Sequence, residues 1–268
     1  MPISLLALDL DGTTLLPDRT IHPASADAIR RAALSGIHVV LASGRNAPSV
    51  RHYASLLGLT GATICCNGAH VLLSAEQELL HHSLEPELVS RLLGYAETHG
   101  LHAHLYSRNR LIFPRDSEWG DLYLHRVGGV QRELLGSQRV EELQVTKLMF
   151  VAEEPRIGKE FRSFASDRAY SGAQLTLSEP EYLEFLPRDA NKGAALQSLA
   201  SHLAIPRSEV AAIGDYLNDL EMLAWAGLGG AVANAADEVR ACARVHVAAN
   251  TEGGVAEFID SYVLNQRE

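Results

Sequence analysis

The feature that most constrains the fold of this chain is a series of short, nearly continuous apolar runs separated by alanine-rich segments that end at glycine. In the first third these segments alternate along the chain, at Ile3–Leu8, Ser25–Leu34, His38–Ser43, Pro48–Leu57 and Ala62–Cys66. Runs that are apolar on both faces predict buried parallel strands, and the glycine-terminated segments predict helices that cover them. The pattern therefore predicts an α/β fold.

In the last third of the chain, short apolar runs again alternate with segments that have helical periodicity. This pattern predicts helices and strands in turn, at Lys192–Leu203, Glu209–Ile213, Leu217–Ala226, Gly230–Ala233, Asp237–Ala243, Val245–Ala248 and Gly254–Val263. We therefore predict one Rossmann-like core with a doubly wound, mainly parallel sheet, split into residues 1–82 and 189–268.

Between residues 83 and 188 apolar and polar residues alternate instead. Strands are expected at Leu101–Tyr106, Leu111–Pro114, Val145–Val151, Gln174–Leu177 and Tyr182–Leu186, with helices at Glu87–Thr98 and Arg156–Ala165. Alternation is typical of a sheet with one apolar face, so we predict an α+β cap domain inserted at 83–188.

Composition limits the possible classes of protein. The 268 residues are 47% hydrophobic and 21% charged, which is ordinary for globular chains and excludes a disordered, collagenous or coiled-coil protein. The net charge of −10 argues against nucleic acid and anionic membranes as partners.

Two further observations concern the compartment. Cys65, Cys66 and Cys242 are an odd number with two adjacent, which is not a disulfide framework and fits a reducing cytoplasm. The apolar run at the amino end is too short for a signal peptide, and the longest charge-free apolar stretch is shorter than the ~18 residues of a membrane helix. We therefore expect a cytoplasmic protein.

Two carboxylates follow the first predicted strand directly. Asp9 and Asp11 stand in the sequence Asp-Leu-Asp-Gly-Thr-Thr, at the strand end where open α/β sheets bind ligands. Side chains two apart on a strand point to the same side, so the two charges would repel unless a cation or a proton lay between them. A polar strand exit with Asp11 capping a turn is the simpler alternative.

Three more polar segments follow strands or open helices. Ser43-Gly44-Arg45 could hold phosphate oxygens, although Ser-Gly after a strand is also a common turn. Lys192 opens an alanine-rich helix, where an ordinary surface lysine would also fit. The segment Gly214–Asp219 contains Asp215, Asn218 and Asp219, three oxygen-bearing side chains that suit a hard cation such as Mg²⁺.

In this order, Asp9–Thr14, Ser43, Lys192 and Gly214–Asp219 resemble the four motifs of the haloacid dehalogenase superfamily of aspartate-nucleophile phosphotransferases. An insertion between the second and third motifs resembles the Cof-type sugar phosphatases, which have a type C2B cap. Further matches are Asn67-Gly68-Ala69, Asn234-Ala235, and Asn250 followed by Glu252–Ala256. The resemblance spans nearly all of 1–82 and 189–263. Two positions depart from the family pattern: Ser43 stands where the second motif more usually has threonine, and Val232-Ala233 stands where Met-Gly commonly precedes Asn-Ala. The insertion resembles the cap of that branch only in its pattern of helices and alternating strands.

The resemblance implies a reaction and a cofactor. Asp9 would attack phosphorus and form an aspartyl phosphate. Asp11, with a raised pKa, would protonate the leaving group and later take a proton from water. Mg²⁺ would be held by the Asp9 carboxylate, the Asp11 backbone carbonyl and Asp215.

The resemblance also implies how phosphate is bound. Ser43, the amides of Leu10 and Gly44, Lys192 and Asn218 would bind the phosphoryl oxygens. Asp219 would orient Lys192, or would hold the metal ligands in place without binding the metal directly. The expected partner is a small phosphorylated metabolite, first of all a sugar phosphate.

Some residues leave alternatives open. His99, His102 and His104 could suggest a metal, but a solvated or substrate-facing strand is favoured. With Arg108 and Arg110, His102 and His104 are the first candidates for reading the leaving group. Arg45 could reach the phosphate or pair with a carboxylate.

Alternative functions are a phosphomutase, a signalling module that accepts a phosphoryl group without turnover, and a silent Mg²⁺ binder. The 83–188 insertion and Asp11 favour catalysis, with the insertion as a mobile cap that selects the substrate. The sequence specifies neither the substrate nor the oligomeric state.

Overall fold

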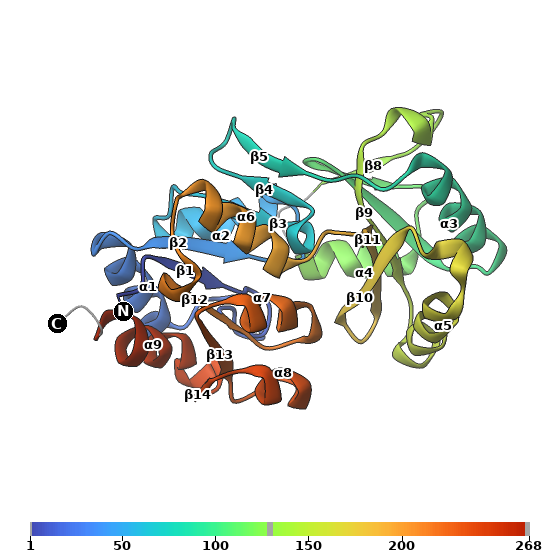
Figure 1. Cartoon of the computed structure of the whole chain (residues 1–268). Helices are drawn as coiled ribbons and strands as arrows, with labels where there is room; N and C mark the ends of the chain where they lie inside the picture. The colour runs from blue at the N-terminus through green and yellow to red at the C-terminus, as the bar shows by residue number, and fades with distance from the viewer. Residues whose placement is uncertain (1, 128–130, 266–268) are drawn as a thin grey trace.

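The computed structural model describes residues 2–127 and 131–265, and the strands of these residues form two sheets (Figure 1). The larger sheet has the order β14-β13-β12-β1-β2-β3-β4-β5. Its strands are β1 Leu5–Leu8, β2 His38–Ala42, β3 Thr63–Cys65, β4 His70–Leu72, β5 Glu78–His81, β12 Val210–Gly214, β13 Leu228–Val232 and β14 Val245–Val247. From β14 to β3 neighbouring strands run parallel, and β4 and β5 add an antiparallel edge. The predicted mainly parallel sheet is confirmed.

Helices cover both faces of this sheet. They are α1 Pro23–Leu34, α2 Ala47–Leu57, α6 Lys192–His202, α7 Leu220–Trp225, α8 Asp237–Cys242 and α9 Gly254–Phe258. The helix α1 contacts α2 and α9, whereas α6 contacts α7 and α7 contacts α8, as expected when right-handed crossovers run outward in both directions from β1. The sheet is therefore doubly wound, with β1 at its centre and its strands buried on both faces.

The smaller sheet has the order β10-β11-β9-β6-β7-β8. Its strands are β6 His102–Ser107, β7 Arg110–Phe113, β8 Arg132–Leu134, β9 Val145–Val151, β10 Ala173–Glu179 and β11 Tyr182–Pro187, and its helices are α3 Pro86–Thr98, α4 Glu118–Val127 and α5 Glu154–Ser166. The chain enters this inserted module between β5 and α3 and returns between β11 and α6. The predicted α+β insertion is present, although α4, β8 and the hairpin β4–β5 were not predicted.

The expectation of a sheet with one apolar face is wrong. The strands β6, β9 and β11 are buried along their whole length. On one side Leu148 and Phe150 pack with α3 and α5, and on the other Met149 packs with Tyr123 of α4 and with Cys66 of the core. The second face is covered because α4 and the larger domain lie against it (Figure 1).

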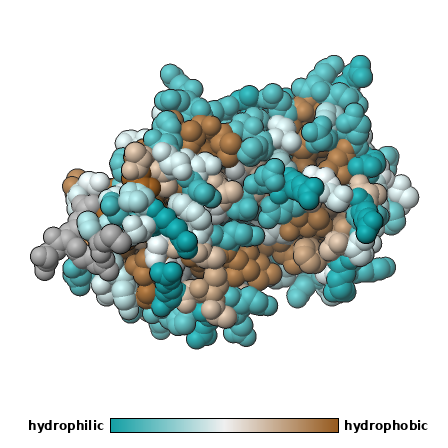
Figure 2. Space-filling view, viewed as in Figure 1, coloured by the Kyte–Doolittle hydropathy of each residue, from teal (hydrophilic) through white to brown (hydrophobic). Residues whose placement is uncertain are grey.

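The exposed surface is mixed in character. On the face shown in Figure 2, hydrophobic side chains lie in several separate groups between hydrophilic ones. Within residues 2–127 and 131–265, the helices are too short or too polar for any of them to cross a membrane.

Candidate active site

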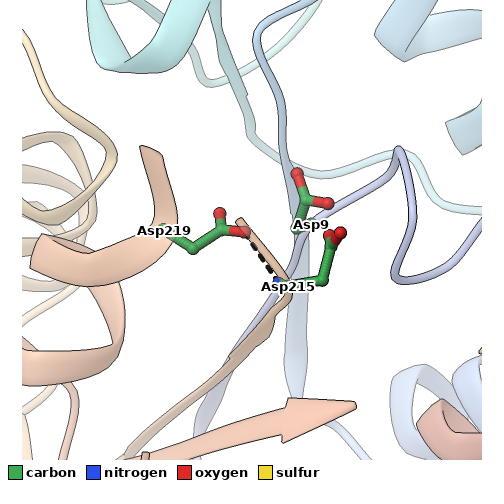
Figure 3. Close-up of side chains that lie close together, drawn as sticks. All are labelled: Asp9, Asp215 and Asp219. Atoms are coloured by element: carbon green, nitrogen blue, oxygen red, sulfur yellow. Dashed lines mark hydrogen bonds between the residues drawn. The ribbon is translucent and has the colours of Figure 1, made fainter. Parts of the chain in front are cut away.

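Three carboxylates meet at one edge of the larger sheet. The strands β1 and β12 are parallel neighbours, with Leu8 opposite Ile213, so the chain leaves both at the same edge. Asp9 follows β1 and Asp215 follows β12, and Figure 3 shows their carboxyl groups side by side with Asp219 approaching them. One carboxylate oxygen of each residue lies within 4.8 Å of the other two. The predicted sheet edge therefore brings these acids together.

Lys192 lies between two of these acids. It is completely buried, and its Nζ lies 2.6 Å from Asp9 Oδ1 and 2.7 Å from Asp219 Oδ1. Its place at the start of α6 follows from a local cap, because Asn191 Oδ1 accepts the N–H of Ala194 at 2.7 Å. The alternative of an ordinary surface lysine is wrong.

Asp219 has both carboxylate oxygens occupied. Oδ1 accepts from Lys192, and Oδ2 accepts the backbone N–H groups of Asp215 at 3.0 Å and Tyr216 at 3.2 Å. These contacts fix the Lys192 ammonium and the loop after β12 at the same time. They favour the role of Asp219 as an orienting group.

The buried cluster carries more negative than positive charge. Burial, followed by the charge of Asp219, raises the pKa of Asp9 well above its ordinary value and raises the pKa of Asp215 to about 7. Burial lowers the pKa of Lys192, but the charges of Asp219 and Asp9 outweigh it and raise that pKa. Carboxylate oxygens crowded this closely fit a hard divalent cation, which would offset the repulsion that Lys192 alone leaves among them. The donor set therefore suits Mg²⁺.

The predicted phosphate-binding residues surround the same carboxylates. Ser43 and Gly44 follow β2, the neighbour of β1, and Asn218 belongs to the 3₁₀ turn Leu217–Asp219 before α7. Ser43 is fully buried, and so is Leu10 beside Asp9. A single cavity is lined by Asp9, Asp11, Ser43, Gly44 and Asn218.

Asp11 differs from its prediction. Its carboxylate accepts two hydrogen bonds from Arg45, Nε to Oδ2 and Nη2 to Oδ1, both at 2.7 Å, and it also pairs with Arg19. Burial raises the pKa of the Asp11 carboxyl, but the hydrogen bonds and charge of Arg45, and then the charge of Arg19, lower it below its ordinary value. The predicted raised pKa is therefore wrong, because the sequence did not show that two arginines meet this acid.

Gly12 allows the chain to turn sharply directly after Asp11. Its φ is +84°, and a Cβ at this position would lie 2.3 Å from Asp215 Oδ2. Only glycine allows both this left-handed turn and the close approach of the Asp215 carboxylate.

The inserted module supplies the other side of the cavity. The residues of the module that line it include Tyr123, Arg126, Lys147, Glu179, Tyr182 and Glu184. The sequence analysis did not select them, although two of them, Lys147 and Glu184, could have been recognised from their positions in the sequence. Each is a charged residue within a buried strand of mostly apolar residues, where an unpaired charge would be costly. They form an ion pair of 2.9 Å in which both side chains are only 1% exposed.

The histidines chosen as candidates do not face this cavity. His102 and His104 are buried, with His102 Nε2 3.1 Å from His104 Nδ1, and both rings pack on Phe113. The expectation of a solvated or substrate-facing strand is wrong because α4 covers these side chains. Within the part of the chain that the structure describes, the group of clustered metal-ligand side chains is the aspartate trio, not the histidines.

The two arginine candidates also lie elsewhere. Arg108 pairs with Glu78, and Arg110 pairs with Glu133 at 2.8 Å, with both side chains of the latter pair exposed. Neither lines the cavity. Of the two alternatives for Arg45, pairing with a carboxylate is the one observed.

A family model for haloacid dehalogenase-like hydrolases matches residues 6–259. The chain belongs to this family. It is 32% identical over 236 residues to the HMP-PP phosphatase of Cronobacter sakazakii, covering 88% of this chain and 86% of that protein. A haloacid dehalogenase-like hydrolase from Bacteroides thetaiotaomicron superposes with a TM-score of 0.85 at 26% identity, covering 97% of this chain and 99% of that one.

The fold also matches the subclass IIB sugar phosphatase BT4131, with a TM-score of 0.84 at 18% identity, covering 97% of this chain and 98% of that one. The predicted membership of the haloacid dehalogenase superfamily is confirmed, and with it the Rossmann-like core with an inserted α+β module. This haloacid dehalogenase-like hydrolase is a phosphoric monoester hydrolase.

Proposed function

We propose that this hydrolase is a Mg²⁺-dependent phosphatase that cleaves small phosphorylated metabolites, first of all sugar phosphates, through an aspartyl phosphate on Asp9. The observation that carries the proposal is the contact of buried Lys192 with Asp9 at 2.6 Å, beside Asp215 and below a polar cavity. Lys192 holds the Asp9 carboxylate in one orientation and offers positive charge to an incoming phosphate.

The reaction would take place in two steps. In the first, a carboxylate oxygen of Asp9 forms a bond to phosphorus and the bond from phosphorus to the ester oxygen breaks. Asp11 would donate a proton to the leaving alkoxide once substrate binding has released its carboxyl from Arg45 and Arg19 and raised its pKa enough for it to be protonated. In the second, water attacks the phosphorus of the aspartyl phosphate and gives a proton to Asp11, which releases orthophosphate and restores Asp9. Ser43, Lys192, Asn218 and the Leu10 and Gly44 amides would bind the phosphoryl oxygens.

Asp9, Asp215 and the backbone carbonyl of Asp11 would hold the Mg²⁺ ion, which would neutralise charge on the phosphoryl group. Asp219 would stay with Lys192, because its two oxygens are already engaged. Asp9 would thus be both nucleophile and metal ligand, Asp215 a metal ligand, and Asp219 the partner of Lys192.

Residues 83–188 would act as a cap that closes over the sheet edge and selects the leaving group. Contacts across the two parts of the chain support this role: Lys147 Nζ donates to the Gly44 carbonyl at 2.6 Å, and Glu179 lies 3.4 Å from Arg19. The lining is rich in charged and hydroxyl groups, which suits a hydroxylated leaving group. The phosphatase name of the Cronobacter relative agrees with a small phosphorylated substrate.

The test is a screen for phosphate release with Mg²⁺ over sugar phosphates, nucleotides, flavin mononucleotide and pyridoxal phosphate, comparing kcat/KM. Product analysis should find orthophosphate; an isomerised sugar phosphate would instead identify a phosphomutase. Asp9→Asn should reduce turnover to background with the fold intact, because an amide cannot act as the nucleophile. Rapid quench with labelled substrate should place phosphate on Asp9, and label on Ser43 or a histidine would overturn the assignment.

A further inference from the structure

The turn between β3 and β4 has an uncommon backbone. Cys66, Asn67 and Gly68 have φ values of +50°, +52° and +95°, so two residues with a Cβ adopt the left-handed region in succession. Such conformations cost free energy and persist where surrounding contacts hold them. Here the N–H of Cys66 donates to the Arg45 carbonyl at 2.9 Å, and that of Asn67 to the Ser43 carbonyl at 3.0 Å. The turn is thus tied to the predicted phosphate-binding loop.

The side chain of Asn67 joins three parts of the site. It is 1% exposed, and its Oδ1 accepts from Asn218 Nδ2 at 2.9 Å. Its Nδ2 donates to Glu184 of β11. The amide also lies directly on Gly44, where a Cβ would meet Asn67 Oδ1 at 3.2 Å. One buried amide therefore touches two predicted phosphate-binding residues and one residue of the cap.

Glu184 is itself held firmly within the cap. Its Oε1 accepts from Lys147 Nζ at 2.9 Å and from Ser178 Oγ at 2.7 Å, which leaves Oε2 for Asn67. Lys147 also reaches the Gly44 carbonyl. Both bonds from this ion pair to the core depend on the cap lying against the sheet edge.

We propose that Asn67 is a positioning residue that links closure of the cap to the phosphoryl-binding groups. With the cap closed, Glu184 fixes the orientation of the Asn67 amide, and Asn67 Oδ1 in turn orients the Asn218 amide beside Gly44. The inference rests on the proposed phosphatase function for its kinetic measurement only. The bond between Asn67 and Glu184 can be tested without turnover.

The test exchanges donor and acceptor. Asn67→Asp places two carboxylates face to face. In Glu184→Gln the NH₂ group replaces one of the two accepting oxygens. It then faces the Asn67 NH₂ group in one orientation of the amide and the Lys147 ammonium in the other, and both of these are donors. In the double variant the carboxylate introduced at position 67 can accept from Asn218 and from the amide introduced at position 184, whose oxygen still accepts from Lys147. The pairing is restored with its direction reversed.

Each single variant should lower kcat/KM for a sugar phosphate by about tenfold or more, as expected for loss of a hydrogen bond to a charged group. The double variant should return to within about threefold of the wild type. Independent losses that multiply to about 100-fold in the double variant would overturn the proposal.

Hydrogen exchange measured by mass spectrometry gives the second measurement. Protection of β11 and of the Cys66–Gly68 turn should fall in both single variants and return in the double variant. Asn250→Ala is the matched control, since Asn250 is a buried asparagine whose amide donates within the core to the Leu15 carbonyl, and it should leave β11 protected. Unchanged protection in the single variants would refute the link. A wild type that releases no phosphate from any substrate would refute the proposed function and leave this measurement decisive.

Discussion

The Lys192 ammonium lies 2.6 Å from the Asp9 carboxylate, although the two residues are 183 positions apart in the chain. The contact exists because β1 ends and α6 begins at the same edge of the sheet. It gives the candidate nucleophile a buried cationic neighbour that a second carboxylate, that of Asp219, holds in place.

Lys192→Met should therefore destabilise the protein and inactivate it. Removing this ammonium leaves Asp9 and Asp219 buried without their partner, which costs about 3–5 kcal/mol in the free energy of unfolding. Turnover should fall by about 100-fold or more, because a group that binds the transferring phosphoryl is lost. Urea unfolding and kcat measurements test both effects. The control is exposed Lys159→Met, and a Lys192→Met variant as stable as this control would contradict the burial argument.

Asp215→Ala should raise the Mg²⁺ concentration needed for half-maximal activity by about tenfold or more, since a proposed ligand is removed. Ca²⁺ should inhibit the wild type, because it prefers longer bonds and more ligands than Mg²⁺. Steady-state rates across metal titrations are the measurement. Full wild-type activity in excess chelator would remove the basis for the metal site.

Arg126→Ala should change substrate preference more than chemistry. Arg126 lines the cavity from α4 and donates to Tyr182 Oη at 3.2 Å, so its loss alters the leaving-group side. We expect kcat/KM for sugar phosphates to fall by about tenfold, with little change for acetyl phosphate. Arg110→Ala is the matched control on the same module, because Arg110 lies outside the cavity. Equal losses for both substrates would contradict a role in selection.

Acid should weaken the inserted module. Burial lowers the pKa of His102 to about 4 and the pKa of His104 well below its ordinary value. In the unfolded chain these histidines titrate near 6.5, so between about pH 6.5 and 4 the unfolded state binds more protons and the free energy of unfolding falls as pH falls. His104→Gln, which cannot titrate, should show a smaller loss between pH 7 and 5. Urea unfolding at both pH values tests this, with exposed His99→Gln as the control. A His104→Gln profile as steep as that of the wild type would show that this side chain is not the cause.

Much of the candidate site could be predicted because its residues stand at strand ends. In a parallel sheet the carboxyl ends of neighbouring strands share one edge, so the positions of Asp9, Ser43 and Asp215 after apolar runs already place them together. Strand β9 coincides with its prediction at Val145–Val151. Strand boundaries such as these can be predicted because the alternation of apolar and polar residues within a segment shows which of its own side chains are buried.

Only the tertiary structure decided which partners these side chains meet. The pKa of Asp11 is low because Arg45, 34 positions away, turns back onto it, and a strand pattern does not record that contact. Lys147 reaches Gly44 across 103 positions, and His104 is buried because α4 covers a face that alternation had suggested was open. Charge, proton affinity and substrate-facing position depend on groups brought close in space, whereas the sequence by itself determined the buried parallel strands of the core, the sheet edge and the acids that stand on it.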